Sequence, residues 1–279
     1  MPLVHLTDLI SKPDNTYAIG AFNVSDMEMA MGAIKAAEEL EAPLILQIAE
    51  GRLRYSPLDL LGPVMIAAAK KCKMPTAVHL DHGSTMETIK LALDLGFTSV
   101  MFDGSKYPLD ENIARTKEVV KLAKSYGADV EARLAASAAR RVTTRASTSS
   151  SRVSRRPSAL LRSPASMRWP SPSARLTATT KRSRSSASIA QGDPCSRQDA
   201  ARPARRHGPD GNGFRTCLAN GIQKINIATA SYDASAAKIK EVAAANPQAK
   251  YFDFSDAIVQ GTYENVKKHM HIFGLEHKA

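Results

Sequence analysis

Two parts of the chain, residues 1–132 and 213–279, repeat one pattern: a short apolar run, then a stretch in which apolar residues recur every three or four positions. The short runs predict strands at Tyr17–Asn23, Pro43–Ile48, Thr76–Leu80, Ser99–Phe102, Asp129–Ala132 and Gln223–Ala228. The longer stretches predict helices at Met27–Leu40, Leu58–Lys71, Thr85–Leu95, Asp110–Tyr126, about Ser231–Ala244 and about Ala257–Phe273. Asp110 or one of its neighbours could cap the fourth of these. Strands that alternate with helices indicate an α/β fold with a parallel sheet.

Six strands are two too few for a closed barrel of eight, and the gap between the two parts is long enough for two more strand–helix units. This gap, about residues 133–209, is rich in Ser, Ala, Arg, Pro and Thr, and Trp169 is its one Phe, Tyr or Trp residue. It shows neither a strand period nor a helix period, so it should bury too little apolar surface to offset the entropy of ordering. We therefore expect an aberrant segment, disordered or badly packed, inside a single domain that spans residues 1–279.

Charge is distributed as unevenly as hydrophobicity. Residues 133–207 hold 17 of the 38 Lys and Arg but only 2 of the 27 Asp and Glu, so the remainder is mildly acidic although the net charge is +11. A basic segment of this kind admits a second interpretation, a non-catalytic protein whose disordered arm binds nucleic acid. The near-absence of aromatic residues for base stacking makes nucleic acid the less favoured partner.

Cysteine spacing and hydropathy exclude several other classes. The three cysteines have no CxxC spacing, which argues against a disulfide framework and against a zinc finger. No apolar run is long enough to cross a bilayer, and the first residues lack the basic start and apolar core of a secretory signal. We expect a cytoplasmic protein with no membrane partner.

The pair Asp81-His82 follows the predicted strand Thr76–Leu80, at the end of the strand where barrel active sites gather. A neutral imidazole is a good zinc ligand, and an adjacent carboxylate can move a proton to or from a hydroxyl held near the metal. The alternative is an Asp that caps the next helix with a His packed beside it. The pair therefore predicts metal-assisted carbonyl chemistry, with a purely structural role left open.

Other strand ends carry further candidates. Asp103 and Glu131 end the next two predicted strands, and three successive ends with acids or His favour a metal site over three unrelated turns. Asn226, Ile227, Ala228 and Thr229 end a strand and open a helix, so their amides and side chains could hold a phosphate at the positive helix end. Alternatively, Thr229 or Ser231 could be an ordinary helix cap. Asn23, directly after Gly20-Ala21-Phe22, is a weaker candidate for a residue near the substrate, because a polar residue at a strand end is usually part of a turn.

Taken in order and with these spacings, the motifs GAFNV, HLDHG, MFDGS, VEA and KINIAT resemble those of the class II, metal-dependent ketose-bisphosphate aldolases. The resemblance covers residues 1 to about 134 and 210–279. It implies a (β/α)8 TIM barrel, dimeric or tetrameric, that reversibly cleaves fructose or tagatose 1,6-bisphosphate to dihydroxyacetone phosphate and glyceraldehyde 3-phosphate, a lyase reaction of glycolysis and carbohydrate metabolism. It also implies Zn²⁺ or another divalent metal, with a monovalent cation as a further candidate.

The resemblance also implies residue roles. Asp81 matches the proton-transfer acid, His82 the first zinc ligand and Asp103 a carboxylate at a secondary metal position. The segment Asn226–Thr229 matches the loop that binds the dihydroxyacetone phosphate end. The metal would polarise the ketone and hold the enediolate charge. An aldolase for the phosphate of a deoxy sugar acid is a third interpretation, because these motifs define the enolate half of the substrate better than the aldehyde half.

The chain departs from the family pattern at the metal site. Where the family reads VEAELG, this chain has Arg133 in place of the second Glu, and the two His of later AHG and LHG motifs are absent. His207-Gly208 looks like a relic of one motif but lies too close to Phe214 to serve as a ligand. One imidazole cannot make the three-ligand site of catalytic zinc, so we expect this polypeptide to fold poorly and to bind zinc weakly.

The genetic code suggests a cause, which we state as a hypothesis. When each third base is regrouped with the next two, Pro164–Lys181 permits TGVDALAVAIGTAHGHYK, a buried strand followed by the missing AHG. A further shift lets Pro203–Pro209 read LHGATG. Single-base losses near Leu134, Ala190 and Pro209 would produce this pattern, and resequencing the gene would test it.

Overall fold

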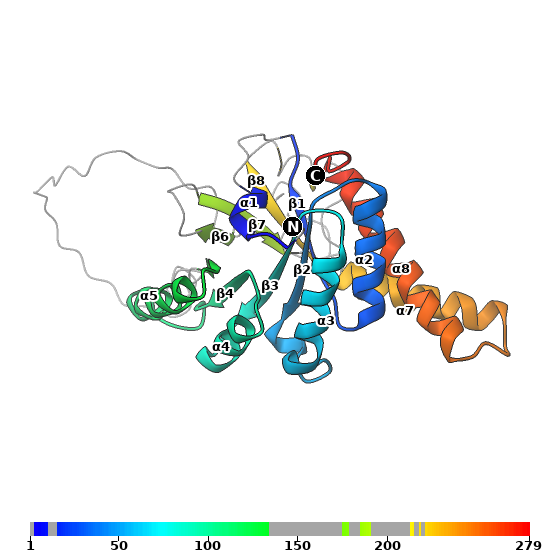
Figure 1. Cartoon of the computed structure of the whole chain (residues 1–279), viewed down its shortest axis with the longest axis horizontal. Coiled ribbons are helices and arrows are strands. Elements are labelled where there is room, and N and C mark those ends of the chain that lie inside the picture. Colours follow the sequence, from blue (N-terminus) through cyan, green and yellow to red (C-terminus); the bar gives the residue numbers. More distant parts are fainter. Residues whose placement is uncertain are drawn as a thin grey trace, which may run out of the picture.

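Strands and helices alternate along the chain as the hydrophobic pattern predicts (Figure 1). The structure, a computed structural model, describes residues 3–10, 16–133, 175–178, 185–190, 213–214, 218 and 221–279. The strands are β1 Ile19–Asn23, β2 Leu44–Ala49, β3 Thr76–Gly83, β4 Ser99–Asp103, β5 Asp129–Arg133, β6 Arg175–Ala178, β7 Ser185–Ala190 and β8 Ile222–Ile227. The helices are α1 Leu6–Ile10, α2 Met27–Glu39, the 3-10 turn η1 Glu50–Arg52, α3 Leu58–Lys71, α4 Met86–Asp94, α5 Leu109–Ser125, α7 Thr229–Ala245 and α8 Tyr251–Ile272.

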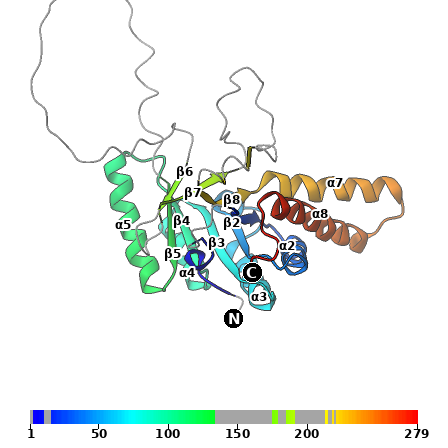
Figure 2. The same cartoon turned by 90° about the horizontal axis from the view of Figure 1, so that it is seen from above.

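The strands form one sheet in the order β5-β4-β3-β2-β1-β8-β7-β6, and its two end strands, β5 and β6, lie beside each other. Neighbouring strands from β5 through to β7 are parallel. Figure 2 shows the strands in the middle of the molecule and helices α2 to α5 around the outside. Parallel strands wrapped by helices are the predicted α/β barrel arrangement, in which every parallel strand ends at the same rim.

The expectation that residues 133–209 could not complete the sheet was wrong for two short stretches. Strand β7 pairs in parallel with β8, and β6 pairs with β7 in the antiparallel sense. Only residues 179–184 separate β6 from β7, and a parallel crossover needs a dozen residues or more, so this connection enforces antiparallel pairing. Residue 133, the first of the expected aberrant segment, is the last residue of β5. The disorder expected for most of this segment, the basic arm among it, falls outside the described residues.

Three helix starts differ from the prediction. Helix α5 has Pro108 at its N-cap and no side-chain capping bond, so the prediction that Asp110 or one of its neighbours caps it was wrong. Helix α7 begins at Thr229, and α8 begins at Tyr251, six residues earlier than predicted. The early start of α8 has a local cause, since the Asp253 carboxylate accepts a hydrogen bond of 2.7 Å from the Lys250 N–H.

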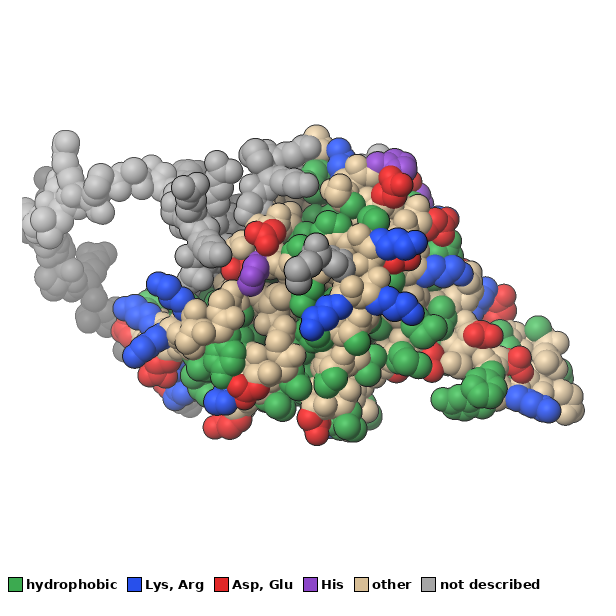
Figure 3. Space-filling model, in the orientation of Figure 1, with side chains coloured by type: hydrophobic (Ala, Val, Ile, Leu, Met, Phe, Trp, Pro, Cys, Tyr) green, Lys and Arg blue, Asp and Glu red, His purple; other side chains and the backbone are tan. Residues whose placement is uncertain are grey.

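Helices α7 and α8 pack against each other and extend beyond the barrel (Figure 1), while α8 also packs on α2. On the face shown in Figure 3, a hydrophobic patch lies near the free end of this helix pair, where α8 begins with Tyr251 and Phe252, 71% and 77% exposed. None of the helices in the described residues combines the length and apolar character needed to cross a membrane. The buried apolar side chains of the strands and helices form one hydrophobic core. This core holds the strands in place, and with them the rim at their ends.

Candidate functional site at the barrel rim

Strand β3 continues three residues beyond its predicted end, so Asp81 and His82 belong to the strand itself. Asp81 is 4% exposed, and its Oδ1 has no hydrogen-bond partner among the described residues. The following helix is capped by another residue, because the Thr85 hydroxyl accepts the Thr88 N–H at 3.2 Å. The interpretation of Asp81 as a helix cap is therefore wrong. A buried carboxylate oxygen without a partner is costly, which indicates a functional role.

The backbone at His82 adopts an unfavourable conformation. Its φ is +53°, in the left-handed region, and the pairing of β3 with β4 shifts register between Leu80 and Gly83. Glycine is required at position 83 because a Cβ there would meet the Met101 carbonyl oxygen at 2.6 Å. Glu50 holds the turn from outside, since its carboxylate accepts hydrogen bonds from the N–H of Ser84 and, at 3.2 Å, from the Thr85 hydroxyl. Left-handed geometry of this kind is concentrated at functional sites.

This turn directs His82 towards β4 and β5. His82 Nδ1 lies 2.6 Å from Asp103 Oδ2, and Arg133 Nη1 lies 2.9 Å from the same oxygen. His82 Nε2 lies 3.9 Å from Asp81 Oδ1. The side chains of His82, Arg133 and Asp103 are 28%, 23% and 14% exposed, so the cluster lies at the edge of the barrel interior.

The ionised carboxylate of Asp103 determines which ring nitrogen of His82 carries a proton. Burial raises the pKa of Asp103, but the hydrogen bonds of its carboxylate with His82 and Ser105 and the charge of Arg133 outweigh burial and hold the pKa well below its usual range. An ionised carboxylate can only accept hydrogen bonds, so His82 Nδ1 must carry the proton of this contact. Orientation of an imidazole by a carboxylate in this way is common in metal sites.

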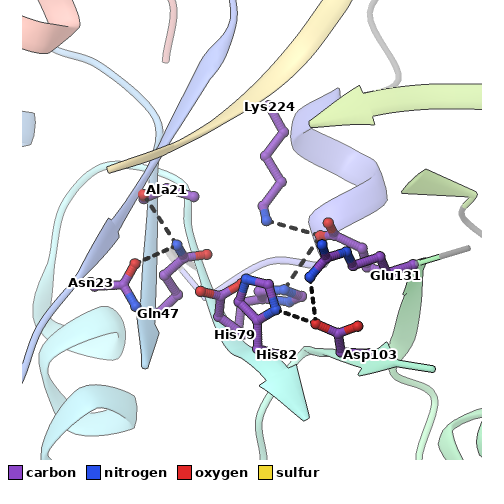
Figure 4. A network of polar contacts seen from close by, with 10 residues as sticks. Ala21, Asn23, Gln47, His79, His82, Asp103, Glu131 and Lys224 are labelled. Atoms are coloured by element: carbon purple, nitrogen blue, oxygen red, sulfur yellow. Dashed lines mark hydrogen bonds and ion pairs between the residues drawn. The ribbon is translucent and has the colours of Figure 1, made fainter. Parts of the chain in front are cut away.

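A second polar cluster lies deeper in the barrel (Figure 4). Lys224 Nζ donates to Glu131 Oε2 at 2.9 Å, His79 Nε2 lies 3.4 Å from the same oxygen, and His79 Nδ1 lies 2.8 Å from Ser99 Oγ. All four side chains are at most 1% exposed. Burial would raise the pKa of Glu131, but Lys224 and His79 hold it well below its usual range, while burial and the charge of Lys224 lower the pKa of His79. The cluster is thus an ion pair beside a neutral imidazole.

Amide side chains from neighbouring strands line another part of the interior. Gln47 Nε2 donates to Asn23 Oδ1 at 2.7 Å and to the Ala21 carbonyl at 3.3 Å (Figure 4). Gln47 Oε1 and Asn226 Oδ1 are buried and have no hydrogen-bond partner among the described residues. Two buried acceptors and the Asp81 oxygen are suited to a ligand that brings hydroxyl donors.

The start of α7 forms the rim next to β1. Ala228 is its N-cap and makes no side-chain capping bond, so Thr229 is the first helical residue and not an ordinary cap. Tyr232 accepts a hydrogen bond of 3.0 Å from Ser25, and Arg52 lies over its ring. Burial, more than the nearby charge of Asp81, raises the pKa of Tyr232. A cavity of about 310 Å³ beside this ring is lined by Ser25, Asp26, Met29, Arg52, Tyr55, Tyr232 and neighbouring residues of α7 and α8.

The structure brings some predicted residues together and separates others. Asp81, His82 and Asp103 form one cluster, whereas Glu131 lies deeper and pairs with Lys224. Sequence reasoning missed Gln47, His79 and Lys224, each a polar residue within an otherwise apolar strand. Because side chains alternate along a strand, His79 lies on the same face of β3 as Asp81, and Lys224 on the same face of β8 as Asn226. This alternation was the signal that could have found them.

A divalent metal does not fit the rim as described. The described residues contain no group of three His, Cys, Asp or Glu side chains placed to hold one ion. His82 supplies one imidazole, and the Asp103 carboxylate is already engaged by His82, Ser105 and Arg133. Catalytic zinc needs three protein ligands. We therefore assign no chemical step to a metal in this chain.

A parallel barrel with a strained, partly unpaired polar rim at its strand ends is the architecture of a barrel enzyme site. Residues 5–151, more than half of the chain, match the family of class II fructose-bisphosphate aldolases. The chain belongs to this family, which is generally metal-dependent.

Curated relatives match the first half of the chain. It is 46% identical over 136 residues to a fructose-bisphosphate aldolase of Giardia intestinalis, a match that covers 48% of this chain and 42% of that protein. It is 41% identical over 138 residues to a probable fructose-bisphosphate aldolase of Bacillus subtilis, covering 48% of each. The chain thus spans a little under half the length of the curated relatives that it matches.

Solved structures extend the similarity of fold to nearly the whole chain. The YdjI aldolase from Escherichia coli K12 superposes with a TM-score of 0.71 at 24% identity, covering 99% of both chains. A putative fructose-1,6-biphosphate aldolase from Coccidioides immitis gives a TM-score of 0.66 at 20% identity over 95% of this chain and 92% of the other. These likenesses confirm the predicted (β/α)8 fold class.

Proposed function

We propose that this protein acts on a ketose 1,6-bisphosphate, fructose or tagatose bisphosphate, in the aldol cleavage that the names of its relatives describe. The observation that carries the proposal is Asp81, a buried carboxylate whose Oδ1 has no hydrogen-bond partner among the described residues, beside a His held in left-handed geometry. The barrel interior also has two buried amide oxygens, Gln47 Oε1 and Asn226 Oδ1, that suit a polyol. We propose one domain over residues 1–279 as the unit that binds the sugar.

In this proposal Asp81 is the acid–base group. It accepts the proton of the C4 hydroxyl as the C3–C4 bond breaks, and the bonding electrons remain on the dihydroxyacetone phosphate half as an enediolate. The other half leaves as glyceraldehyde 3-phosphate. A proton then adds to C3 of the enediolate to give dihydroxyacetone phosphate, Asp81 releases its proton to solvent, and condensation follows the reverse path. Asn23 and Asn226 would contact sugar hydroxyls, because both side chains are buried. Asn23 is the last residue of β1, and Asn226 is next to last in β8.

The segment Asn226–Thr229 would bind the phosphate of the dihydroxyacetone half. It joins the end of β8 to the first turn of α7, where free N–H groups and the helix dipole favour an anion. The nearby Arg52 adds positive charge on the side of the cavity described above. Parallel strands carry Asp81 and this segment to the same rim, as a single bound sugar phosphate requires.

The family resemblance carries four further predictions: zinc as the metal, a monovalent cation, Asp103 as a further ligand, and a dimer or tetramer. Glu131 as a ligand is a prediction carried by its place at a strand end. Glu131 would have to leave Lys224 to reach a metal, since its Oε2 is 2.9 Å from that ammonium. Because the rim lacks a complete ligand set, we expect weak zinc binding and slow cleavage. A slow reaction that still requires Asp81 is the outcome that this geometry supports.

The test is release of glyceraldehyde 3-phosphate from fructose 1,6-bisphosphate by the purified full chain, compared with Asp81→Asn. We expect a slow rate that falls to background in the variant, and a parallel assay with tagatose 1,6-bisphosphate defines the preferred sugar. Equal rates for the wild-type chain and Asp81→Asn with both sugars would contradict the proposed function. The third interpretation, a deoxy sugar acid phosphate, would then be assayed in the same way, and RNA binding by the full chain would test the second.

A further inference from the structure

We propose that Arg133 supplies, through its guanidinium, the positive charge that the His82–Asp103 pair would otherwise gain from a divalent cation, and that it thereby lowers the affinity of the rim for such ions. The inference concerns cation binding in the absence of substrate. It therefore stands or falls independently of the sugar that the protein cleaves.

The first argument is the shared atom. Asp103 Oδ2 accepts from His82 Nδ1 at 2.6 Å and from Arg133 Nη1 at 2.9 Å. The guanidinium charge thus lies one carboxylate oxygen away from the imidazole that would bind a metal. Like charges at such separations repel, and the repulsion is strong where the surroundings are partly shielded from water, as these side chains are.

The second argument is that the Arg133 backbone is held in place. Arg133 is the last residue of β5, paired in register with Asp103 of β4. Its carbonyl accepts a hydrogen bond of 3.0 Å from Asn112 Nδ2, and Asn112 is 1% exposed. A guanidinium remains charged at every pH at which the protein is folded. The positive charge at this place is therefore permanent and positioned by the sheet.

The third argument is the shortage of competing ligands. The chain has seven His residues. His79 lies deeper, in contact with Ser99 and Glu131, and His269 and His271 are on α8. His277 lies 2.9 Å from Glu41, His5 lies beside the start of β3 at the other end of the barrel, and His207 falls outside the described residues. Among the described residues, His82 is thus the one imidazole at the rim, so no surplus of ligands there offsets the charge of Arg133.

The experiment is a titration of the full chain with Zn²⁺ alone, in competition with a chromogenic chelator. Arg133→Met removes the charge and keeps a long apolar side chain, and we expect Zn²⁺ to bind about tenfold more tightly than in the wild type. Arg133→Glu also adds a carboxylate beside His82 and Asp103, and we expect a gain of about a hundredfold. Arg115→Glu, with the same change of charge on the exposed face of α5, should match the wild type.

The variant Arg133→Glu/His82→Ala identifies the site, since it should lose the gain of Arg133→Glu. Unchanged Zn²⁺ affinity in Arg133→Met and Arg133→Glu would overturn the proposal, and so would an equal gain in Arg115→Glu. If the Arg133 variants do not fold, the Zn²⁺ affinity of the wild-type chain is compared with that of His82→Ala to test the proposal. Submicromolar Zn²⁺ binding that is lost in His82→Ala would refute the role of Arg133, whereas weak binding unaffected by His82→Ala would support it.

Discussion

Two polar clusters share the interior of this barrel, and they differ in the pairing of a buried carboxylate. Each cluster also has one buried side-chain atom without a hydrogen-bond partner among the described residues, His79 Nε2 in the deep cluster and Asp81 Oδ1 at the rim. In the deep cluster, Lys224, Glu131, His79 and Ser99 contact one another within 3.4 Å and are at most 1% exposed. At the rim, Asp81 has a buried oxygen with no hydrogen-bond partner among the described residues, and His82 adopts a φ of +53°. The deep cluster resembles a structural support, whereas the rim retains unpaired and strained groups.

This difference suggests that the deep cluster contributes to stability and the rim to ligand binding. Buried charges that are paired stabilise a fold only as a set, since removal of one partner leaves the other uncompensated. Unpaired groups at a rim cost stability and are retained where a ligand uses them. The comparison therefore predicts large losses of stability from substitutions in the deep cluster, and small losses from substitutions at Asp81.

The largest effect is expected for Lys224→Met, which leaves the Glu131 carboxylate buried without its cation. We expect the free energy of unfolding to fall by about 3–5 kcal/mol, measured by urea denaturation. Lys240→Met, on the exposed face of α7, should change it by less than about 0.5 kcal/mol. The double variant Lys224→Met/Glu131→Gln should recover much of the loss; no recovery would show that packing, and not charge pairing, sustains the deep cluster.

The second effect is a pH dependence that comes from His79. Its pKa is lowered from the usual 6.5 by burial and by Lys224. Because the folded state resists a proton that the unfolded state takes up below pH 6.5, stability is complete above that pH and falls as the pH decreases. One proton gives a slope of about 1.4 kcal/mol per pH unit.

Urea denaturation of His79→Gln between pH 7.5 and 5 measures this contribution, and the variant should show a flatter profile than the wild type. His277→Gln, at an exposed position, should retain the wild-type slope. Identical profiles for His79→Gln and the wild type would mean that His79 is not held neutral in the fold.

A smaller effect is expected at the support of the rim. Thr85→Ala removes the side-chain cap of α4, directly after the His82 turn, and should lower the free energy of unfolding by about 1 kcal/mol. Thr85→Ser keeps the hydroxyl and should keep the stability. Equal losses in both variants would assign the effect to the methyl group and not to the cap.

The smallest change in stability is expected for Asp81→Asn. The amide removes a buried carboxylate whose Oδ1 has no partner, so the free energy of unfolding should stay within about 0.5 kcal/mol of the wild type or rise. Sugar bisphosphate cleavage should nevertheless fall by about a hundredfold or more, because the proton acceptor is lost. A loss of stability as large as that of Lys224→Met would place Asp81 with the structural support instead.

Local patterning predicted most of the fold. The limits of β1 to β5 and β8 lie within three residues of the predicted ones, because buried strands and amphipathic helices have different periods. Strands β6 and β7 could not be predicted, since their residues show no such period. The match to the family runs to residue 151, which is 17 residues beyond Leu134, so it does not test the hypothesis of a lost reading frame, which stays a prediction.

The candidate site was predictable in its residue types but not in its pairings. Asp81, His82 and Asp103 followed from strand ends, because parallel strands end at one rim. The contact between Lys224 and Glu131 joins residues 93 positions apart and depends on barrel closure. The contact between Arg133 and Asp103 depends on the register of β4 and β5, which no local pattern defines.

The most direct test of the central claim, that a sugar bisphosphate binds at the rim between Asp81 and the start of α7, is an amide NMR titration with fructose 1,6-bisphosphate. We predict saturable shifts at Asp81–Gly83 and Asn226–Thr229, and none at Leu6–Ile10, which contacts Asp129 at the opposite end of the barrel. Absence of shifts at both rim segments, with the sugar either unbound or bound elsewhere, would contradict the account.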